Sequence, residues 1–404
     1  MILIMAWRNI WRNKARSLII LSSVMIGLFT GIFVLALYRG MIDGRIRVVI
    51  EDEVSHLQLH HPEFKKDYEA RYVIGNSEEL IKSVSGLRQV SAMAPRDIAQ
   101  GMLSTGTGSN GVEIRGVIPE KEVAVSRLDK KIIEGNYFSS EKRNELLIGK
   151  KLFDKMKLKL HNKVVLTFSD KDNNVTSGAF RIAGVFRSAN TALDERIVFV
   201  RSGELAGLLN IAGSYHELAI LLYRNEDVAG VQQLLRAKYA GLSVENWKEI
   251  SPETELTIST MNQFSLIIIA IIMLALAFGI VNTMLMAILE RTHETGMMVA
   301  LGMNKLRLFT LVLSETIFLT LAGTPAGLLL AWGTTLYISK HGIDTASYAG
   351  EVMGSFGYSS VIYPEFPADQ LIAVMGIVAA TAILSAIFPA VKALRLQPVE
   401  ALRK

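Results

Sequence analysis

The chain has 404 residues, of which 50% are hydrophobic, and it carries a formal net charge of +5. An apolar content this high, gathered into long runs, is typical of a protein with a few membrane spans. Because the chain has no cysteine, structural disulfides, cysteine-held iron–sulfur clusters and cysteine chemistry are excluded. The basic residues stand beside the apolar runs and not in one separate patch, which favours contact with membrane lipid over binding of nucleic acid.

The first 16 residues predict an amphipathic helix in the membrane interface. Trp7 and Trp11 are four residues apart, and so are Arg8 and Arg12. On a helix they form an aromatic ridge beside a basic ridge, with the tryptophans among the lipid headgroups and the arginines toward the phosphates. We therefore expect residues 1–16 to anchor the chain to the membrane.

Four apolar stretches are long enough to cross a bilayer. The first carries no charge, and at about 1.5 Å per residue it reaches ~33 Å, enough for a hydrocarbon core of ~30 Å. A secretory signal peptide is the less favoured interpretation of this stretch, because it is too long for an h-region and lacks a small-residue cleavage site. Transmembrane helices 1 to 4 are predicted at residues 17–38, 264–289, 308–339 and 371–391.

Lysine and arginine in the short flanks predict the orientation of the spans. They gather before the first span, between the second and third spans and after the fourth span. The loop between spans three and four has Lys340 as its one such residue, beside several acids. We expect both termini, the segment 290–307 and the tail 392–404 in the cytoplasm. Residues 39–263 and the short loop 340–370 would lie outside.

Residues 39–263 are polar enough to form a mixed α/β domain in two lobes. Alternating apolar and polar residues predict strands at Ser55–His60, Gly111–Val117, Lys163–Phe168, Phe180–Phe186 and Arg196–Val200. Helical spacing predicts helices at Asn76–Val84, Glu145–Met156 and Glu226–Tyr239. The run 171–174 reads as a turn between two of the strands.

Catalytic and metal-binding patterns are weak in this sequence. His56, His60, His61 and Glu63 lie close enough in sequence to make a metal site conceivable, but a solvated strand end is the favoured interpretation. The nearest approach to a phosphate-binding loop, at 149–151, lacks the upstream glycine and the hydroxyl residue after lysine. We therefore expect no enzyme activity, metal or cofactor in this chain, and any ATP and Mg would be bound by a partner.

Small residues and one acid stand out within the predicted spans. Gly27 and Gly31 in span one, and Gly323 and Gly327 in span three, have the spacing that allows close approach of helices. Glu315 lies in the apolar run of span three. Two interpretations of Glu315 stay open: a functional acid that faces protein or water, or a side chain that reaches the cytoplasmic headgroups. Four spans are few for a solute pathway, so we expect a dimer.

The segment 290–307 carries charges of both signs, although a loop that only connects two spans would be basic. Its apolar residues fall at helical spacing and glycines punctuate it. This combination favours a docking surface for a protein, and a helix lying on lipid is the alternative. The candidate docking residues are Glu290, Arg291, Glu294, Gly296, Met297, Met298, Leu301 and Gly302.

Several of these residues together resemble the FtsX/MacB-like ABC permease family. The resemblance rests on the run from Glu290 to Gly302 followed by Glu315, on the closing segment 389–403, and on motifs of the large domain at 135–138, 145–150, 184–186 and Asp194. Position 295 departs from the family pattern, with Thr in place of an aliphatic residue.

The resemblance implies a type VII ABC fold: an α-helical membrane domain of four transmembrane helices, plus a mixed α/β extracytoplasmic domain inserted between helices 1 and 2. It also implies a bacterial inner-membrane location with the large domain in the periplasm. Two permease protomers, identical or related, would pair with two copies of an ABC ATPase subunit. The segment 290–307 would be the coupling helix, which passes motion from the ATPase to the periplasmic domain by mechanotransmission.

Three branches of the family differ in what they move. The layout resembles the lipoprotein-releasing permeases LolC/LolE most, which implies lipoprotein cargo extracted from the inner membrane. Since the chain begins almost directly with span one, a fused ATPase is not expected. MacB-like export with a separate ATPase and a periplasmic adaptor, and FtsX-like control of a cell-wall hydrolase, are the alternatives. Release needs an apolar cleft, for which the candidate lining residues are Met25, Ile26, Phe29, Phe33, Phe264, Ile268, Ile271 and Met284.

Overall fold

The computed structural model describes residues 2–12, 14–75, 77–106, 108–139, 141–290, 292–293, 297–298 and 303–394. The chain forms two compact units, each considered by itself below. Unit 1 comprises Met1–Ile42, Thr257–Ile343 and Ile362–Lys404. Unit 2 comprises Asp43–Leu256 and Asp344–Val361.

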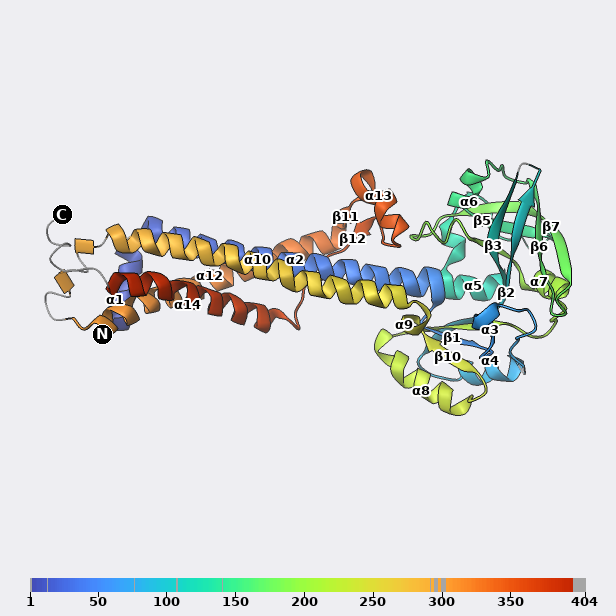
Figure 1. Cartoon of the computed structure of the whole chain (residues 1–404), viewed down its shortest axis with the longest axis horizontal. Coiled ribbons are helices and arrows are strands. Elements are labelled where there is room, and N and C mark those ends of the chain that lie inside the picture. Colours follow the sequence, from blue (N-terminus) through green and yellow to red (C-terminus); the bar gives the residue numbers. More distant parts are fainter. Residues whose placement is uncertain are drawn as a thin grey trace. The chain divides into compact units, whose positions relative to one another are not determined.

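Unit 1 is helical (Figure 1). Its helices are α1 (Ile2–Arg12), α2 (Lys14–Val48), α10 (Pro252–Glu290), α12 (Lys305–His341) and α14 (Leu371–Leu394). Four helical segments are long and apolar enough to cross a membrane: Ser17–Val54, Pro252–Glu290, Lys305–His341 and Leu371–Lys392. The first two extend beyond the predicted spans, because hydropathy marks the apolar part of a helix and not the residue where its hydrogen bonding ends.

Small residues let the helices of unit 1 approach closely. A Cβ atom added at Gly27 would lie 3.0 Å from the side chain of Leu276 on α10. One added at Gly323 or Gly327 would lie 3.1 or 2.8 Å from a backbone oxygen of α2. Both glycine pairs predicted from the sequence therefore stand at helix contacts. The apolar core of unit 1 fills the space between α2, α10, α12 and α14.

Unit 2 is built on one sheet of ten strands. The strands are β1 (Leu57–His60), β2 (Val90–Thr105), β3 (Gly108–Val117), β4 (Ile132–Gly135), β5 (Glu145–Gly149), β6 (Lys163–Ser169), β7 (Val175–Phe186), β8 (Ile197–Arg201), β9 (Glu217–Leu222) and β10 (Ser243–Asn246). Their order is β10-β1-β9-β2-β3-β8-β5-β7-β4. Because β6 pairs with both β2 and β7, the strands β2-β3-β8-β5-β7-β6 close into a barrel.

Unit 2 also contains short helices. They are the π-helix η1 (Val49–Val54), α3 (Phe64–Asp67), α4 (Ser77–Ser85), α5 (Pro119–Ser126), the 3₁₀-helix η2 (Leu128–Lys131), α6 (Lys150–Lys155), α7 (Ser202–Leu209), the 3₁₀-helix η3 (Asn225–Asp227), α8 (Val228–Lys238), α9 (Trp247–Ile250) and α13 (Ala346–Ser355). The two-residue strands β11 (Ile343–Asp344) and β12 (Val361–Ile362) pair with each other and flank α13. They lie within residues 340–370, for which the sequence predicts only a short loop.

Two main hydrophobic cores lie in unit 2, and strand β2 takes part in both. The barrel lobe has a core of inward-facing strand residues, with Leu152 of α6 and Leu205 of α7 packed into it. The layer lobe consists of β10, β1, β9 and the first half of β2, covered by α4 and α8. Strand β2 pairs with β9 over 90–96 and with β3 over 96–105. The long strand β2 therefore joins the lobes (Figure 1).

All five strands predicted from the sequence are present, as are the turn at 171–174 and the helices near 76–84 and 226–239. The prediction of one helix over Glu145–Met156 is wrong. Its first half is the strand β5, and a helix begins only at Lys150. Strand β5 runs between β7 and β8 with all five residues buried, and a strand buried on both faces has no alternation that would separate it from a helix.

Candidate functional site

A polar network forms where α2 ends inside unit 2. The helix does not stop at its last α-helical residue but widens into the π-helix η1. Ser55 closes the segment with a φ of 68°, and its N–H donates to the carbonyl oxygen of Ile50 at 3.0 Å. Single π-turns of this kind are often found at functional sites. We call the residues that meet here the junction: Arg45, Asp52, Glu53, Lys131, Asn190, Thr254 and Gly357.

Arg45 is the centre of the junction, and three segments of unit 2 meet at its guanidinium group. Nη1 donates to Glu53 Oε1 at 2.5 Å and to the carbonyl oxygen of Gly357 at 3.1 Å. Nη2 donates to Thr254 Oγ1, in the first turn of α10, at 2.9 Å. Arg45 and Glu53 are each only 8% exposed, so this ion pair is largely withdrawn from water.

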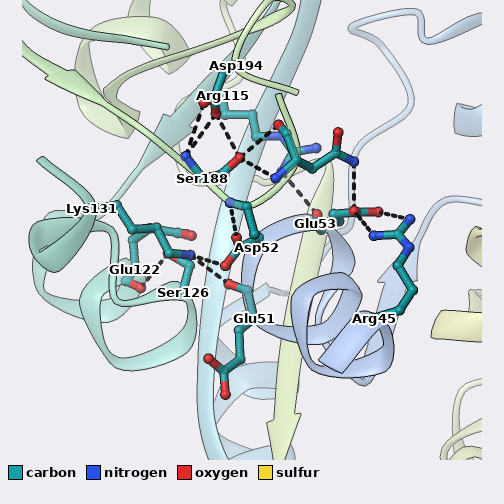
Figure 2. A network of polar contacts seen from close by, with 12 residues as sticks. Arg45, Glu51, Asp52, Glu53, Arg115, Glu122, Ser126, Lys131, Ser188 and Asp194 are labelled. Atoms are coloured by element: carbon teal, nitrogen blue, oxygen red, sulfur yellow. Dashed lines mark hydrogen bonds and ion pairs between the residues drawn. The ribbon is translucent and has the colours of Figure 1, made fainter. Parts of the chain in front are cut away.

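The acidic residues of η1 connect the junction to the barrel lobe, as Figure 2 shows. Asn190 Nδ2 donates to Glu53 Oε1 at 2.8 Å, and Arg115 of β3 donates to the Glu53 carbonyl oxygen at 3.2 Å. Asp52 accepts from Lys131 Nζ at 2.5 Å and from the N–H of residue 189 at 3.0 Å. The end of the first apolar helix is thus attached to two separate parts of this lobe.

The loop 187–195, which contacts the junction, carries hydrogen bonds of its own (Figure 2). Asp194 accepts from the Ser188 N–H at 3.1 Å and from Ser188 Oγ at 2.7 Å. Burial raises the pKa of Asp194 to about 6, although these hydrogen bonds oppose the shift. The N–H of Thr191 donates to the carbonyl oxygen of Gly354 at 3.0 Å, which ties the α13 segment to the same loop.

A second buried ionic group joins the two lobes at the middle of β2. Arg96 donates to both carboxylate oxygens of Glu122 on α5, at 3.0 and 2.8 Å, and to Glu217 on β9 at 3.0 Å. Burial alone would raise the pKa of Glu122, but the neighbouring guanidinium holds that pKa below its usual value. The bidentate geometry fixes α5 of the barrel side to a strand of the layer lobe.

These contacts connect distant segments of the chain. Each links chain segments that are distant in sequence through buried charge-assisted hydrogen bonds, which are directional and strong. Removing one partner of a buried ion pair costs about 3–5 kcal/mol, because an uncompensated charge is left inside the protein. The junction therefore binds its segments firmly to one another.

The predicted docking segment is only partly described. Glu290 is the last residue of α10 and is exposed. Met297 is 45% exposed, and the carbonyl oxygen of Met298 accepts from the Met303 N–H at 3.0 Å. The other five docking residues, Arg291, Glu294, Gly296, Leu301 and Gly302, lie outside the described residues. The assignment of the whole segment as an ATPase contact stays a prediction.

The residues predicted to line a cleft are distributed over both surface and core. Ile26, Phe264 and Ile271 are each more than half exposed. Phe29 and Phe33 are half-buried with stacked rings whose centroids lie 5.7 Å apart, and Met25 and Ile268 are half-buried as well. Met284 is 1% exposed and belongs to the core of unit 1, where its Sδ lies 3.9 Å from Thr316 Oγ1.

Glu315 and the N-terminal helix both pack within unit 1. Glu315 is 4% exposed and lies on the buried face of α12 with Thr316, so it faces protein. The amphipathic helix predicted for the N-terminus is α1. Its Trp7 ring makes edge contacts with Trp11 at 6.1 Å and with Phe318 of α12 at 5.8 Å. The ridge of tryptophans therefore contacts a neighbouring helix as well as the surface.

The clustered histidines point to separate partners. His56 Nδ1 accepts from the Leu222 N–H at 3.2 Å, and burial lowers the pKa of His56 to about 4. His60 Nε2 lies 3.2 Å from Glu245, and the ring of His61 stacks on Tyr72. Among the residues that the structure describes, no three metal-ligating side chains converge.

The sequence patterns do not reveal the junction. They predict a soluble domain from residue 39 onward, whereas α2 continues to Arg45 and beyond. One signal was available: the run from Arg45 to Glu53 places two arginines and then three acids a few residues after the first apolar stretch. Nothing in the sequence pointed to Asn190, Thr254 or Gly357 as their partners.

The C-terminal helices match the model of a known protein family. Residues 266–398, which include most of α10 and all of α12 and α14, match the model of the FtsX-like permease C-terminal family. The chain therefore carries an FtsX-like permease domain.

Similar curated proteins agree with this class. The macrolide export ATP-binding/permease protein MacB of Bdellovibrio bacteriovorus is 33% identical over 162 residues, which cover 40% of this chain and 22% of that protein. The pyoverdine export ATP-binding/permease protein PvdT of Pseudomonas entomophila is 24% identical over 98% of this chain and 58% of its own length. The lipoprotein-releasing system transmembrane protein LolC of Neisseria meningitidis is 20% identical over 80% of each chain.

The chain thus spans less than two thirds of MacB and of PvdT. Among solved structures, the periplasmic region of MacB from Actinobacillus actinomycetemcomitans has a TM-score of 0.36 and 13% identity, covering 52% of this chain and 95% of that one. In these comparisons the chain is similar to ABC transporter permeases of the FtsX/MacB/LolC type, which agrees with the resemblance noted in the sequence.

Proposed function

We propose that this chain is the permease subunit of an ATP-driven ABC complex that works by mechanotransmission and extracts lipoproteins from the inner membrane for transfer toward the outer membrane. The observation that carries the proposal is the FtsX-like permease match over 266–398, which takes in the docking segment together with the helices on either side of it. The alignment with LolC over 80% of both chains supports lipoprotein as the cargo.

The energy would come from a partner. Two copies of an ABC ATPase subunit would bind ATP and Mg, and each would contact the segment 290–307 of one permease protomer. The exposed Glu290 and Met297 suit such a contact, since they offer a charge and an apolar side chain on one short segment. Both termini would lie in the cytoplasm, and the strand-rich unit 2 in the periplasm.

The acyl chains of a lipoprotein require an apolar surface within the membrane. Ile26 on α2, together with Phe264 and Ile271 on α10, leaves apolar area uncovered within the single chain. In a pair of protomers these residues would line the cleft, and the half-buried Phe29 and Phe33 would deepen it. Met284, being inside the core, would support the cleft from behind.

Export is the second candidate function. The alignment with PvdT over 98% of this chain favours it, and such a system would need a periplasmic adaptor as a further partner. Control of a cell-wall hydrolase, the third alternative, would need a moving surface on unit 2 and no cleft.

Mass spectrometry of the complex isolated from native membranes through a tagged copy of the chain tests these functions. We expect an ABC ATPase and acylated lipoproteins. An adaptor without lipoproteins would support export, and a cell-wall hydrolase would support signalling. Glu294→Lys is the matched control, because it should lose the ATPase while remaining inserted in the membrane. If no ATPase is recovered with the unaltered chain, the proposal is wrong.

A further inference from the structure

The two lobes of unit 2 are connected to different helices. Residues of η1, which continues α2, accept hydrogen bonds from Lys131 and Arg115 of the barrel lobe, through the Asp52 side chain and the Glu53 carbonyl oxygen. Helix α10 follows directly from the layer lobe through β10 and α9. There, the Trp247 N–H donates to the His56 carbonyl oxygen at 3.1 Å, and Asn246 caps α9. A relative movement of α2 and α10 would therefore act on both lobes.

Arg45 is placed where these two connections meet. Its Nη1 contacts Glu53 at the end of the first helix, and its Nη2 contacts Thr254 at the start of the second. Ser251 and Thr254 join their hydroxyl groups at 2.8 Å, so the link extends into the α9–α10 turn. The planar guanidinium group offers several donors in a fixed geometry, which the single ammonium group of a lysine does not.

The third segment at Arg45 belongs to the stretch between α12 and α14. Gly357 has a φ of +71°, and a Cβ atom at this position would lie 2.5 Å from Arg45 Nη1. Both facts require glycine here, so that the carbonyl oxygen can approach the guanidinium group. The nearby Gly354 carbonyl oxygen accepts from Thr191. Two backbone carbonyl groups therefore hold the α13 segment to the junction.

We infer that the Arg45–Glu53 pair is a coupling latch, which passes movement of the first apolar helix to the start of α10, to the α13 segment and to the loop 187–195. Arg45 is a positioning residue, since it acts through the segments it joins. The inference rests on the proposed function and deepens it, because it names the place where force from the ATPase enters unit 2.

Hydrogen exchange tests the latch in the complete complex of permease and ATPase, measured with and without ATP plus vanadate. The reporters are the Thr191 amide, resolved in overlapping peptides, and the segment 344–361. In the unaltered complex we expect nucleotide to change exchange in both. In Arg45→Lys, which keeps the charge, we expect about tenfold faster exchange at Thr191 and no response to nucleotide. ATP hydrolysis should continue within about twofold of its normal rate.

Arg47→Lys is the matched control, since Arg47 lies two residues further along the same helix and is exposed. It should behave as the unaltered chain does. Gly357→Ala attacks the latch from the opposite side without changing a charge, and it should reproduce the effect of Arg45→Lys. Thermal stability of each variant is recorded alongside, because a merely structural role would lower stability while leaving the nucleotide response in place.

The outcomes separate the latch from the function on which it rests. A normal nucleotide response in Arg45→Lys overturns the latch alone. A response lost equally in Arg47→Lys also overturns it, since the effect would not be specific to the buried pair. If the unaltered complex binds and hydrolyses ATP but neither reporter responds, mechanotransmission through this junction is excluded. If no ATPase associates at all, the proposed function fails first.

Discussion

Replacing Glu53 by glutamine should destabilise unit 2 strongly. The substitution keeps the shape of the side chain but leaves the buried Arg45 without its counter-ion, and it sets an amide donor in place of Glu53 Oε2, against Arg45 Nη2 at 3.5 Å. Loss of one partner of a buried pair costs about 3–5 kcal/mol. We expect the lower value, about 3 kcal/mol, because the glutamine oxygen can still accept one hydrogen bond.

Thermal unfolding of the full chain in detergent measures this effect. Trp247 is buried in unit 2, where its Nε1 donates to Asn225 at 3.1 Å, so its fluorescence reports on this unit once the other tryptophans are replaced by phenylalanine. For a domain of this size, a loss of about 3 kcal/mol corresponds to a fall in Tm of about 6–12 °C.

Glu51→Gln is the control for this prediction. Glu51 lies two residues before Glu53 on the same π-helix, and its backbone carbonyl oxygen accepts from Lys131; its side chain makes no hydrogen bond with the described residues. The Tm of Glu51→Gln should change by less than about 2 °C, because a substitution that breaks no side-chain hydrogen bond or buried ion pair is worth about 0.5 kcal/mol or less. Equal melting temperatures for the two variants would refute the idea that the Arg45–Glu53 pair stabilises the junction.

Three further changes test other parts of the molecule. Burial raises the pKa of Asp97 to about 7, so between about pH 4 and pH 7 the folded state holds a proton that the unfolded state has released. The free energy of unfolding should therefore fall as the pH rises through this range. Asp97→Asn should remove that part of the pH dependence, which urea titrations at a series of pH values measure. Cysteines at Thr191 and Gly354 should form a disulfide on mild oxidation, detected as a shift on a non-reducing gel, because an added Cβ at 354 lies 3.0 Å from Thr191 Cγ2. Gly327→Val should lower the Tm of unit 1 by overpacking against α2, a cost of about 1–3 kcal/mol.

Each of these changes has its own control. For Asp97, whose Oδ2 accepts from Ser202 at 2.6 Å, an unchanged pH profile in Asp97→Asn would contradict the raised pKa. For the disulfide, either single cysteine should give no shift, since the natural chain contains no thiol. For Gly327, the control is Gly333→Val on the same helix, where an added Cβ meets no described atom within 4 Å; equal losses at both positions would argue against close packing.

Local patterns in the sequence were sufficient for much of the fold. Apolar runs marked the four candidate spans, and alternation marked strands that have one face in the core and one in water, such as β6. Strand β5 does not differ from a helix in its pattern, because it lies between β7 and β8 with all its residues buried and so has no alternation between a buried and an exposed face. Hydropathy also could not show how far α2 and α10 continue, since polar residues extend a helix as readily as apolar ones.

The candidate site was harder to predict, for a different reason. Arg45 and Gly357 are separated by 312 positions in the sequence, and Arg45 and Thr254 by 209. Their contacts depend on how the whole of unit 2 is folded, and no local period carries that information. The charges of η1 could be read as unusual from the sequence, but their partners could be named only from the structure. The docking segment 290–307 rests mainly on the sequence prediction, because most of its candidate residues lie outside those that the structure describes.

The shared strand β2 affects how unit 2 folds and unfolds. A single strand of 16 residues supplies backbone partners to both lobes, and Arg96 near its middle binds a carboxylate from each side. Neither hydrophobic core can lose its order without removing a strand from the other. The two lobes should therefore melt as one cooperative block with a single calorimetric transition, and a destabilising substitution in either lobe should lower that shared transition.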